Sequence, residues 1–153
     1  MRVQRQGGFL IAKIHQVAGR VFARKLKAHG IDEINPAQGR ILFVLWQEDG
    51  ISIQELARRT SLGKSTLTNM LDRLESSGHL RRARSAQDRR QIRIQRTPKD
   101  KALEARYADV SQEMTKLFYR GFSPTETDCF EDSLKRILNN LTAFEASGSR
   151  DPR

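Results

Sequence analysis

One segment of the chain concentrates side chains that can bind phosphate. Residues 81–96 contain seven arginines against one aspartate, a net charge of +6, while the whole chain of 153 residues carries +10. Phosphate groups attract arginine side chains whatever the base sequence, so the segment indicates a polyanionic partner such as a nucleic acid. A solvated sheet edge that resists aggregation is the alternative interpretation of these charges.

The pattern around the arginines predicts a β-hairpin. Residues 79–84 form an extended run, residues 85–88 have turn chemistry, and Ile92 and Ile94 then alternate with polar neighbours. An alternation of period two places the isoleucines on one face and the arginines on the other. In a cationic ribbon of this kind some arginines can enter a groove while others meet phosphates. The predicted contacts in the hairpin are made by Arg84, Asp88, Arg89 and Arg90.

Asp88 in the turn has two interpretations. Its carboxylate could pair with one arginine and hold that guanidinium in a fixed orientation, while the neighbouring arginine stays free to enter a minor groove. Alternatively, the aspartate is present because it favours turns.

Two short helices are predicted directly before the hairpin. Residues 52–55 (Ser-Ile-Gln-Glu) have the spacing of a capping box, which starts the first helix, and a Ser-Leu-Gly segment ends it. The second covers about residues 64–77, and Leu67, Leu71 and Leu74 share its inward face. Two helices joined by a tight turn and followed by a basic hairpin form a winged helix-turn-helix.

The outward face of the second helix carries small polar and basic side chains. Asparagine can recognise adenine, arginine can recognise guanine, and threonine can contact the methyl group of thymine. The start of this helix also resembles the end of a nucleotide-binding P-loop, but Arg58 stands where that motif needs glycine. We therefore predict DNA contacts, with a solvated helix surface as the alternative. The predicted contact residues are Lys64, Ser65, Thr66, Thr68, Asn69 and Arg73.

Long helices are predicted on both sides of this segment. Apolar residues repeat at three and four positions in the first helix, and in a 4-3-4-3 pattern from Leu103 to Leu117 and from Phe130 to Phe144. Such narrow stripes are typical of helices that pack against partner helices. One copy of the chain cannot bury all three stripes well, so we predict a homodimer with twofold symmetry.

The predicted fold class is mainly α with a small β-wing, in a single domain over residues 1–153. Residues 35–97 form the winged helix-turn-helix lobe, which is flanked by long dimerisation helices over residues 8–30 and 101–146.

The sequence resembles the MarR family of multiple-antibiotic-resistance-type regulators over about residues 8–146. The resemblance rests on a combination of short motifs: Leu56-Ala57, Lys64 to Thr68, Asp72 to Glu75 followed by Gly78, the Asp88-x-Arg90 signature, and Thr97. Some positions depart from the family pattern, among them His79-Leu80, which replaces the usual apolar pair after Gly78. Arg96 stands where leucine is usual and Asp100 stands near a usual glycine, and we expect Arg96 to loosen the base of the wing.

The resemblance implies a dimeric transcription regulator. In that family the recognition helix enters the major groove, the wing enters the minor groove, and the first and last helices dimerise. Many members release DNA when a small aromatic or phenolic anion binds between the dimerisation lobe and the DNA-binding lobe. An aromatic cleft for such an effector is one interpretation of four residues here, and ordinary core packing is the other. The four are His15, Phe22, Phe43 and Trp46.

Together these features predict a sequence-specific, ligand-responsive homodimeric repressor that binds a pseudo-palindromic operator in double-stranded DNA. A nonspecific architectural or RNA-binding basic protein is the alternative, because it would share the charge without needing twofold symmetry.

Other function classes find little support in the residues. No nucleophile and base are paired in sequence and no cofactor-binding loop is present, so we predict no catalytic site, no enzymatic activity and no cofactor. Three scattered histidines and the single Cys129 do not form a metal-binding pattern. One cysteine excludes an intrachain disulfide, as in a reducing cytoplasm, and no apolar run predicts a membrane segment.

Overall fold

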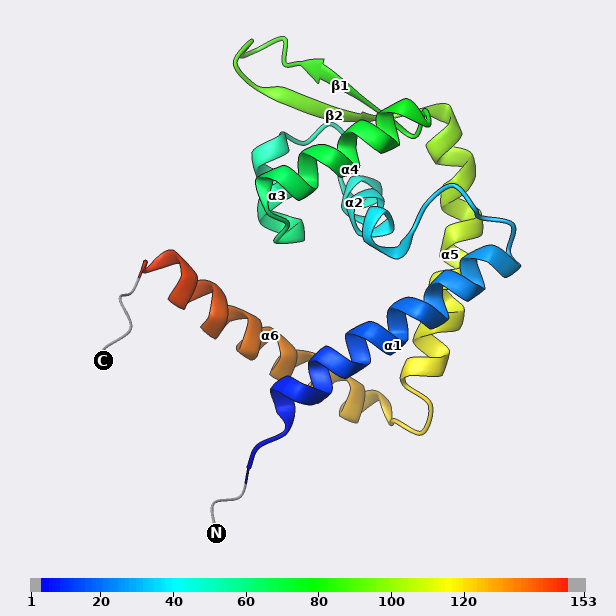
Figure 1. The fold of residues 1–153 in the computed structure, drawn as a ribbon, viewed down its shortest axis with the longest axis vertical. Coiled ribbons are helices and arrows are strands. Elements are labelled where there is room, and N and C mark those ends of the chain that lie inside the picture. Colours follow the sequence, from blue (N-terminus) through cyan, green and yellow to red (C-terminus); the bar gives the residue numbers. More distant parts are fainter. Residues whose placement is uncertain (1–3, 149–153) are drawn as a thin grey trace. The chain divides into compact units, whose positions relative to one another are not determined.

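The computed structural model describes residues 4–148 of the chain, in which helices predominate (Figure 1). The elements in order are α1 (Gly7–Ala28), α2 (Pro36–Gln47), α3 (Ile53–Thr60), α4 (Lys64–Ser76), β1 (Leu80–Arg84), β2 (Ile92–Arg96), α5 (Pro98–Phe118) and α6 (Pro124–Ala146). This confirms the predicted fold class, mainly α with one small β-hairpin. Contacts divide the chain into two compact units, residues 1–113 and 114–153, and the boundary falls within α5.

The first unit is built around a core of buried leucines and isoleucines. Leu67, Leu71 and Leu74 of α4 are buried as their spacing predicts, because residues three and four apart share one helix face. They pack with buried residues of α2, α3, the hairpin and the first half of α5. The same core includes Leu26, Ile41, Leu42, Leu45, Leu56, Leu80, Ile94, Leu103 and Val110.

α2 begins with a complete capping box. The Asn35 side chain accepts from the backbone N–H of Gln38 at 2.8 Å, and the Gln38 side chain accepts from the backbone N–H of Asn35 at 3.0 Å. Pro36 occupies the first helical position, where its missing N–H is not needed.

The capping box predicted for α3 is only half formed. Ser52 Oγ accepts from the backbone N–H of Glu55, as expected for an N-cap. The Glu55 carboxylate does not accept the reciprocal bond from the backbone N–H of Ser52, because it binds the guanidinium groups of Arg58 and Arg59 instead. The second half of that prediction is therefore wrong.

The hairpin is antiparallel, and its register places Arg82 opposite Ile94 and Arg84 opposite Ile92. Residues directly opposite each other point to the same side of a sheet. The predicted separation of isoleucines from arginines is therefore wrong for Arg82 and Arg84, while Arg93, between the two isoleucines, lies on the other face as predicted. Ile94 is buried in the core, whereas Ile92 lies nearer the tip and is 41% exposed.

The base of β2 is also bonded to the loop that follows α2. The backbone N–H of Gly50 donates to the Ile94 carbonyl at 3.0 Å, and the N–H of Ile94 donates to the Ile51 carbonyl at 2.9 Å. Figure 1 shows the hairpin at one edge of this unit, with its connecting loop extending away from α5. The core thus holds the base of the hairpin while its tip projects beyond the helices.

Part of the stripe predicted for α5 packs within the chain itself. Leu103, Tyr107 and Val110 are buried in the core of the first unit, where the Tyr107 ring meets Phe22 and Trp46 edge to face. One copy therefore packs the first half of the α5 stripe, and the prediction that it cannot bury all three stripes well now concerns the other stripes, above all that of α6, which has no buried residue.

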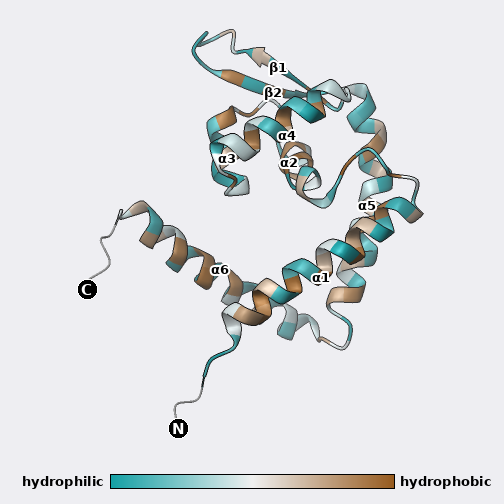
Figure 2. Ribbon diagram, in the orientation of Figure 1, coloured by the Kyte–Doolittle hydropathy of each residue, from teal (hydrophilic) through white to brown (hydrophobic). Residues whose placement is uncertain are grey.

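The second unit contains α6, which has no buried residue. It begins with a capping box at Ser123 and Glu126, in which both reciprocal bonds are present. Apolar side chains nevertheless recur along it, and Leu141 is 64% and Phe144 59% exposed (Figure 2). Across residues 4–148, no helix is both long and apolar enough to cross a membrane.

Candidate nucleic-acid interface

The outer face of α4 presents every residue predicted to contact DNA from this helix. Burial of the three leucines fixes the rotation of α4, so Ser65, Asn69 and Arg73 lie on the side opposite the core. Lys64, Thr66 and Thr68 are exposed as well. The Thr68 hydroxyl donates to the Lys64 carbonyl at 2.9 Å, so its methyl group and its oxygen lone pairs remain available for contacts.

The tip of the hairpin carries exposed arginines. Arg84, Arg89 and Arg90 are exposed, and none of them has an ion pair within the part of the chain that the structure describes. A guanidinium without an internal partner keeps its full hydrogen-bonding capacity for an external phosphate or base. These three are the hairpin arginines predicted to contact DNA.

Asp88 shapes the turn rather than orienting an arginine side chain. Its carboxylate Oδ1 accepts from the backbone N–H of Arg90 at 3.0 Å, and its carbonyl accepts from the N–H of Gln91. Among the described residues it forms no ion pair. The pairing hypothesis for Asp88 is therefore wrong, and the alternative based on turn preference fits the geometry.

Arg82 attaches the hairpin to the recognition helix. Its guanidinium bonds Asp72 at 2.6 Å and Glu75 at 2.8 Å, and its backbone N–H donates to Glu75 at 2.8 Å. The backbone N–H and then the guanidinium of Arg82 lower the pKa of Glu75 below its usual value. The single positive charge of Arg82 offsets part of the negative charge of these two acidic groups of α4, which would otherwise repel a phosphate backbone more strongly.

A groove of about 440 Å³ lies between α3, α4 and the start of β2. It brings together residues predicted separately from two sequence segments, namely Lys64 and Thr68 of α4 and Arg90 of the hairpin. The remaining lining residues are Ser52, Ile53, Gln54, Ala57, Leu67, Gln91 and Ile92. The structure therefore makes one surface from the helix and the hairpin.

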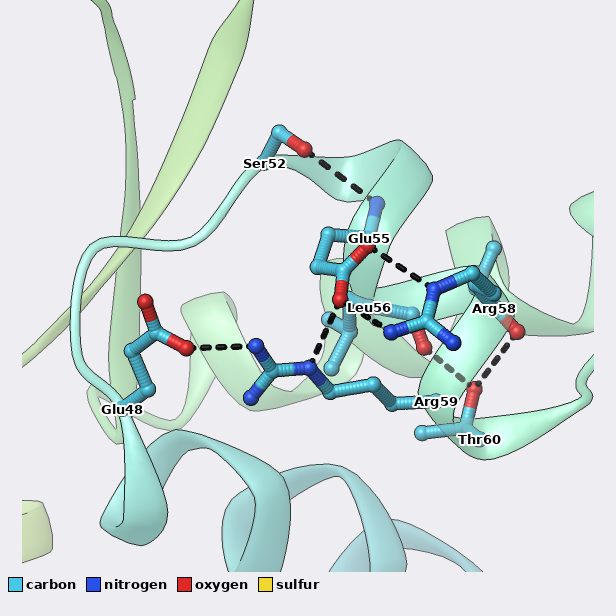
Figure 3. Close-up of polar contacts among 8 residues, drawn as sticks. Glu48, Ser52, Glu55, Leu56, Arg58, Arg59 and Thr60 are labelled. Carbon is cyan, nitrogen blue, oxygen red and sulfur yellow. Dashed lines mark hydrogen bonds and ion pairs between the residues drawn. The ribbon is translucent and has the colours of Figure 1, made fainter.

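The two arginines of α3 differ from those at the tip because both are paired (Figure 3). Glu55 binds Arg58 and Arg59, and Arg59 also reaches Glu48. Hydrogen bonds from Arg58 and Arg59 lower the pKa of Glu55 to about 2. Thr60 closes the helix by donating to the Leu56 carbonyl at 2.7 Å.

Arg96 holds the base of the wing firmly. Its Nε donates to Asp100 and its Nη2 to Glu104, each at 2.6 Å, while its backbone N–H donates to Asp49 at 2.9 Å. The expectation that Arg96 loosens this region is therefore wrong. The sequence contained one usable signal, since Arg96 and Asp100 are opposite charges four residues apart across the start of a helix.

The four residues proposed for an effector cleft lie in different environments. Phe22 and Trp46 pack against Tyr107, and the Trp46 indole N–H is bonded to Asp100. His15 and Phe43 are exposed. The groove described above is lined by none of them. Core packing accounts for the first two, and the cleft stays a prediction.

A helix pair with an exposed reading face, followed by a cationic hairpin, defines a winged helix-turn-helix DNA-binding lobe. Residues 34–92 match the family model described as the MarR family. The chain is 44% identical over 88 residues to the HTH-type transcriptional regulator TtmR of Methylorubrum extorquens (strain PA1). The aligned segment covers 58% of this chain and 44% of TtmR. The matched part is thus less than half the length of that relative.

Two further proteins agree with this match. The HTH-type transcriptional regulator SarZ of Staphylococcus aureus is 29% identical over 104 residues, covering 68% of this chain and 64% of SarZ. A mutant of E. coli MarR, solved in complex with operator DNA, is 28% identical with a TM-score of 0.76 and covers 86% of this chain and 92% of that one. Residues 34–92 are therefore similar to the MarR family.

Proposed function

We propose that the protein is a sequence-specific, homodimeric DNA-binding transcription regulator. The observation that carries the proposal is the single surface made by the exposed face of α4 and the unpaired arginines of the hairpin tip, joined at the groove that contains Lys64, Thr68 and Arg90. The operator DNA bound to the related E. coli MarR mutant supports it.

The two parts of this surface have different roles in the proposal. In the major groove, Asn69 is placed to recognise adenine and Arg73 to recognise guanine. Arg84, Arg89 and Arg90 meet phosphates or enter the minor groove, where negative potential is high when the groove is narrow. Asp88 contributes by setting the turn rather than by direct contact.

The exposed apolar face of α6 supports the homodimer. A second copy related by a twofold axis would cover this face with the same face of its own, as in most small symmetric oligomers. Two recognition helices would then meet half-sites about one helical turn, roughly 34 Å, apart. An operator with pseudo-palindromic symmetry follows from this arrangement.

Repression by blocking a promoter, and release by a small aromatic or phenolic anion, complete the proposal. Both rest on the family resemblance, and so does the cytoplasmic location that a DNA regulator needs. A nonspecific architectural or RNA-binding protein is the competing function, and it predicts equal affinity for all duplexes.

A binding experiment with the full chain separates the two functions. Fluorescence anisotropy at fixed salt should show much tighter binding to an inverted repeat from the DNA upstream of the coding region than to random duplex. Asn69→Ala should weaken binding to the repeat and leave random duplex almost unchanged. Equal affinities of the wild-type protein for both duplexes would overturn sequence-specific regulation.

The salt dependence tests the hairpin separately. Arg89→Ala and Arg90→Ala should each weaken binding to every duplex and reduce the slope of log affinity against log salt by about one unit. Arg106→Ala is a matched control, because Arg106 is an exposed arginine on α5, outside the proposed surface. An unchanged slope in both tip variants would exclude contact between the hairpin and phosphates.

A further inference from the structure

A buried carboxylate joins three elements at the base of the wing. Asp100 of α5 is fully buried, and both of its oxygens accept from the indole N–H of Trp46 in α2, at 3.0 and 3.1 Å. Asp100 Oδ2 also accepts from Nε of Arg96, the last residue of β2, at 2.6 Å. One side chain therefore connects α2, β2 and α5.

This ionic contact is not a surface salt bridge. The Arg96 side chain is largely buried, and its second bond to Glu104 uses another nitrogen of the same guanidinium. A buried charge without a partner is strongly unfavourable, so each member of the pair requires the other. The contact therefore fixes the end of β2 in one position more strictly than an exposed pair would.

The position of Arg96 determines what this contact controls. Leu80 pairs with Arg96 at the base of the hairpin, and the same two strands lead to the tip that carries Arg89 and Arg90. On the other strand, Arg82 ties β1 to α4. Besides the bonds between β2 and the loop after α2, side-chain contacts thus hold the hairpin to the recognition helix on one strand and to α5 and α2 on the other.

We propose that Arg96 and Asp100 are positioning residues for DNA binding, which act through Arg89 and Arg90 by fixing the base of the wing. The inference rests on the proposed function, since it concerns how the tip arginines meet a duplex. Neither Arg96 nor Asp100 contacts DNA in this proposal. They set the direction in which the hairpin leaves the core.

The first experiment compares variants of the full chain by the salt dependence of duplex binding. Arg96→Leu alone leaves Asp100 buried without its cation and could prevent folding, so the main variant is Arg96→Leu with Asp100→Ala. We expect this folded double variant to lose about one to two units of slope, as if the tip arginines had been removed. Arg106→Leu removes one exposed arginine of α5 and should keep the wild-type slope. Arg96→Lys should lie between wild type and the double variant.

A mutant cycle distinguishes positioning from direct contact. When Arg89 and Arg90 are already alanine, adding Arg96→Leu and Asp100→Ala should change neither the slope nor the affinity further. An additional loss in this background would show that Arg96 acts independently of the tip, and would overturn the proposal.

Trp46 offers a readout that needs no DNA. It is the single tryptophan of the chain, and its indole N–H is bonded to Asp100, so Asp100→Ala should shift its emission while Arg106→Leu should not. An altered emission together with a wild-type salt slope would overturn the positioning role and leave the proposed function intact. Absence of duplex binding by the wild-type protein would instead overturn both.

Discussion

The DNA-binding lobe and α6 begin their helices with the same device but differ completely in burial. Asn35-Pro36 in the lobe and Ser123-Pro124 at α6 both form a full capping box with proline at the first helical position. The lobe nevertheless buries its leucines almost completely, whereas the 23 residues of α6 include no buried side chain. Local sequence starts a helix, but only a packing partner can bury its apolar face.

The arginines of the hairpin show a second contrast. Those near its base, Arg82, Arg93 and Arg96, donate to acidic groups or to a backbone carbonyl of the same chain. Those near its tip have no ion pair within residues 4–148. One residue type therefore anchors the hairpin where the chain supplies acceptors, and elsewhere stays free for the DNA contacts that we propose.

The largest effect is expected from placing a charge on the apolar face of α6. Leu141→Glu puts a carboxylate into the proposed twofold contact, where burying it would be strongly unfavourable. We expect monomers in analytical ultracentrifugation and DNA binding about a hundredfold weaker or more, because two linked half-sites become one. Asn139→Glu, which adds the same charge near the opposite face of the helix, should leave the dimer intact. A Leu141→Glu variant that remained dimeric would show that another surface joins the subunits.

A matched pair of truncations tests the difference in burial directly. Leu71→Ala in the lobe leaves a cavity in a packed core and should lower the free energy of unfolding by about 2–5 kcal/mol. The corresponding Leu141→Ala should be measured in a Leu138→Glu background, because a charge on this other exposed leucine of α6 is also expected to prevent the proposed dimer. There it should change the free energy of unfolding by less than about 0.5 kcal/mol, since an exposed leucine has little packing to lose. Urea denaturation followed by circular dichroism provides both values. Equal losses at the two sites would mean that α6 packs within its own subunit.

The spacing of apolar residues and the caps were sufficient to predict most of the helices. Leu67, Leu71 and Leu74 turned inward because a helix has one fixed period, and Asn35 capped α2 because its partner is only three residues away. The exposed contact residues of α4 then followed from the buried ones. Helix caps and buried helix faces depend on residues that are close in sequence, so they can be predicted from one amino-acid sequence.

Choices between competing partners could not be predicted in the same way. The spacing Ser-x-x-Glu forms a full box at Ser123 but not at Ser52, because Glu55 has Arg58 and Arg59 within the next helical turn and binds them instead. Trp46 and Asp100 are 54 residues apart, so no local pattern connects them. The partners of long charged side chains are set by the tertiary fold.

A glycine in α2 marks the tightest packing of the lobe. A Cβ at Gly39 would lie 2.0 Å from the Tyr107 hydroxyl and 2.8 Å from its Cζ, and this ring is already held by Phe22 and Trp46. Gly39→Ala should therefore lower the free energy of unfolding by about 1–3 kcal/mol through overpacking. Thermal and urea unfolding would measure the loss, and Tyr107→Phe in the same chain should recover part of it.

The control for this substitution lies in α1. A Cβ at Gly19 meets no atom within 4 Å, so Gly19→Ala should stabilise the helix by about 0.5–1 kcal/mol, the usual advantage of alanine over glycine. If both substitutions stabilised the protein, the close contact with Tyr107 would not constrain the core.

The smallest effect concerns the exposed ion pairs of α3 and their dependence on pH. Arg58 and Arg59 lower the pKa of Glu55 from 4.5 to about 2, so the folded state favours the ionised carboxylate. Its contribution to stability is complete above pH 4.5 and disappears as the pH falls towards 2. Glu55→Gln should therefore lower the midpoint of thermal unfolding slightly at pH 7, and the difference from wild type should shrink as the pH is lowered from 4.5 to 3.

In an Arg58→Ala, Arg59→Ala background the effect of Glu55→Gln should lose most of its pH dependence, because the cations that depress the pKa are gone. A constant difference between Glu55 and glutamine over this range would mean that the carboxylate acts through its size and hydrogen bonds rather than through its charge.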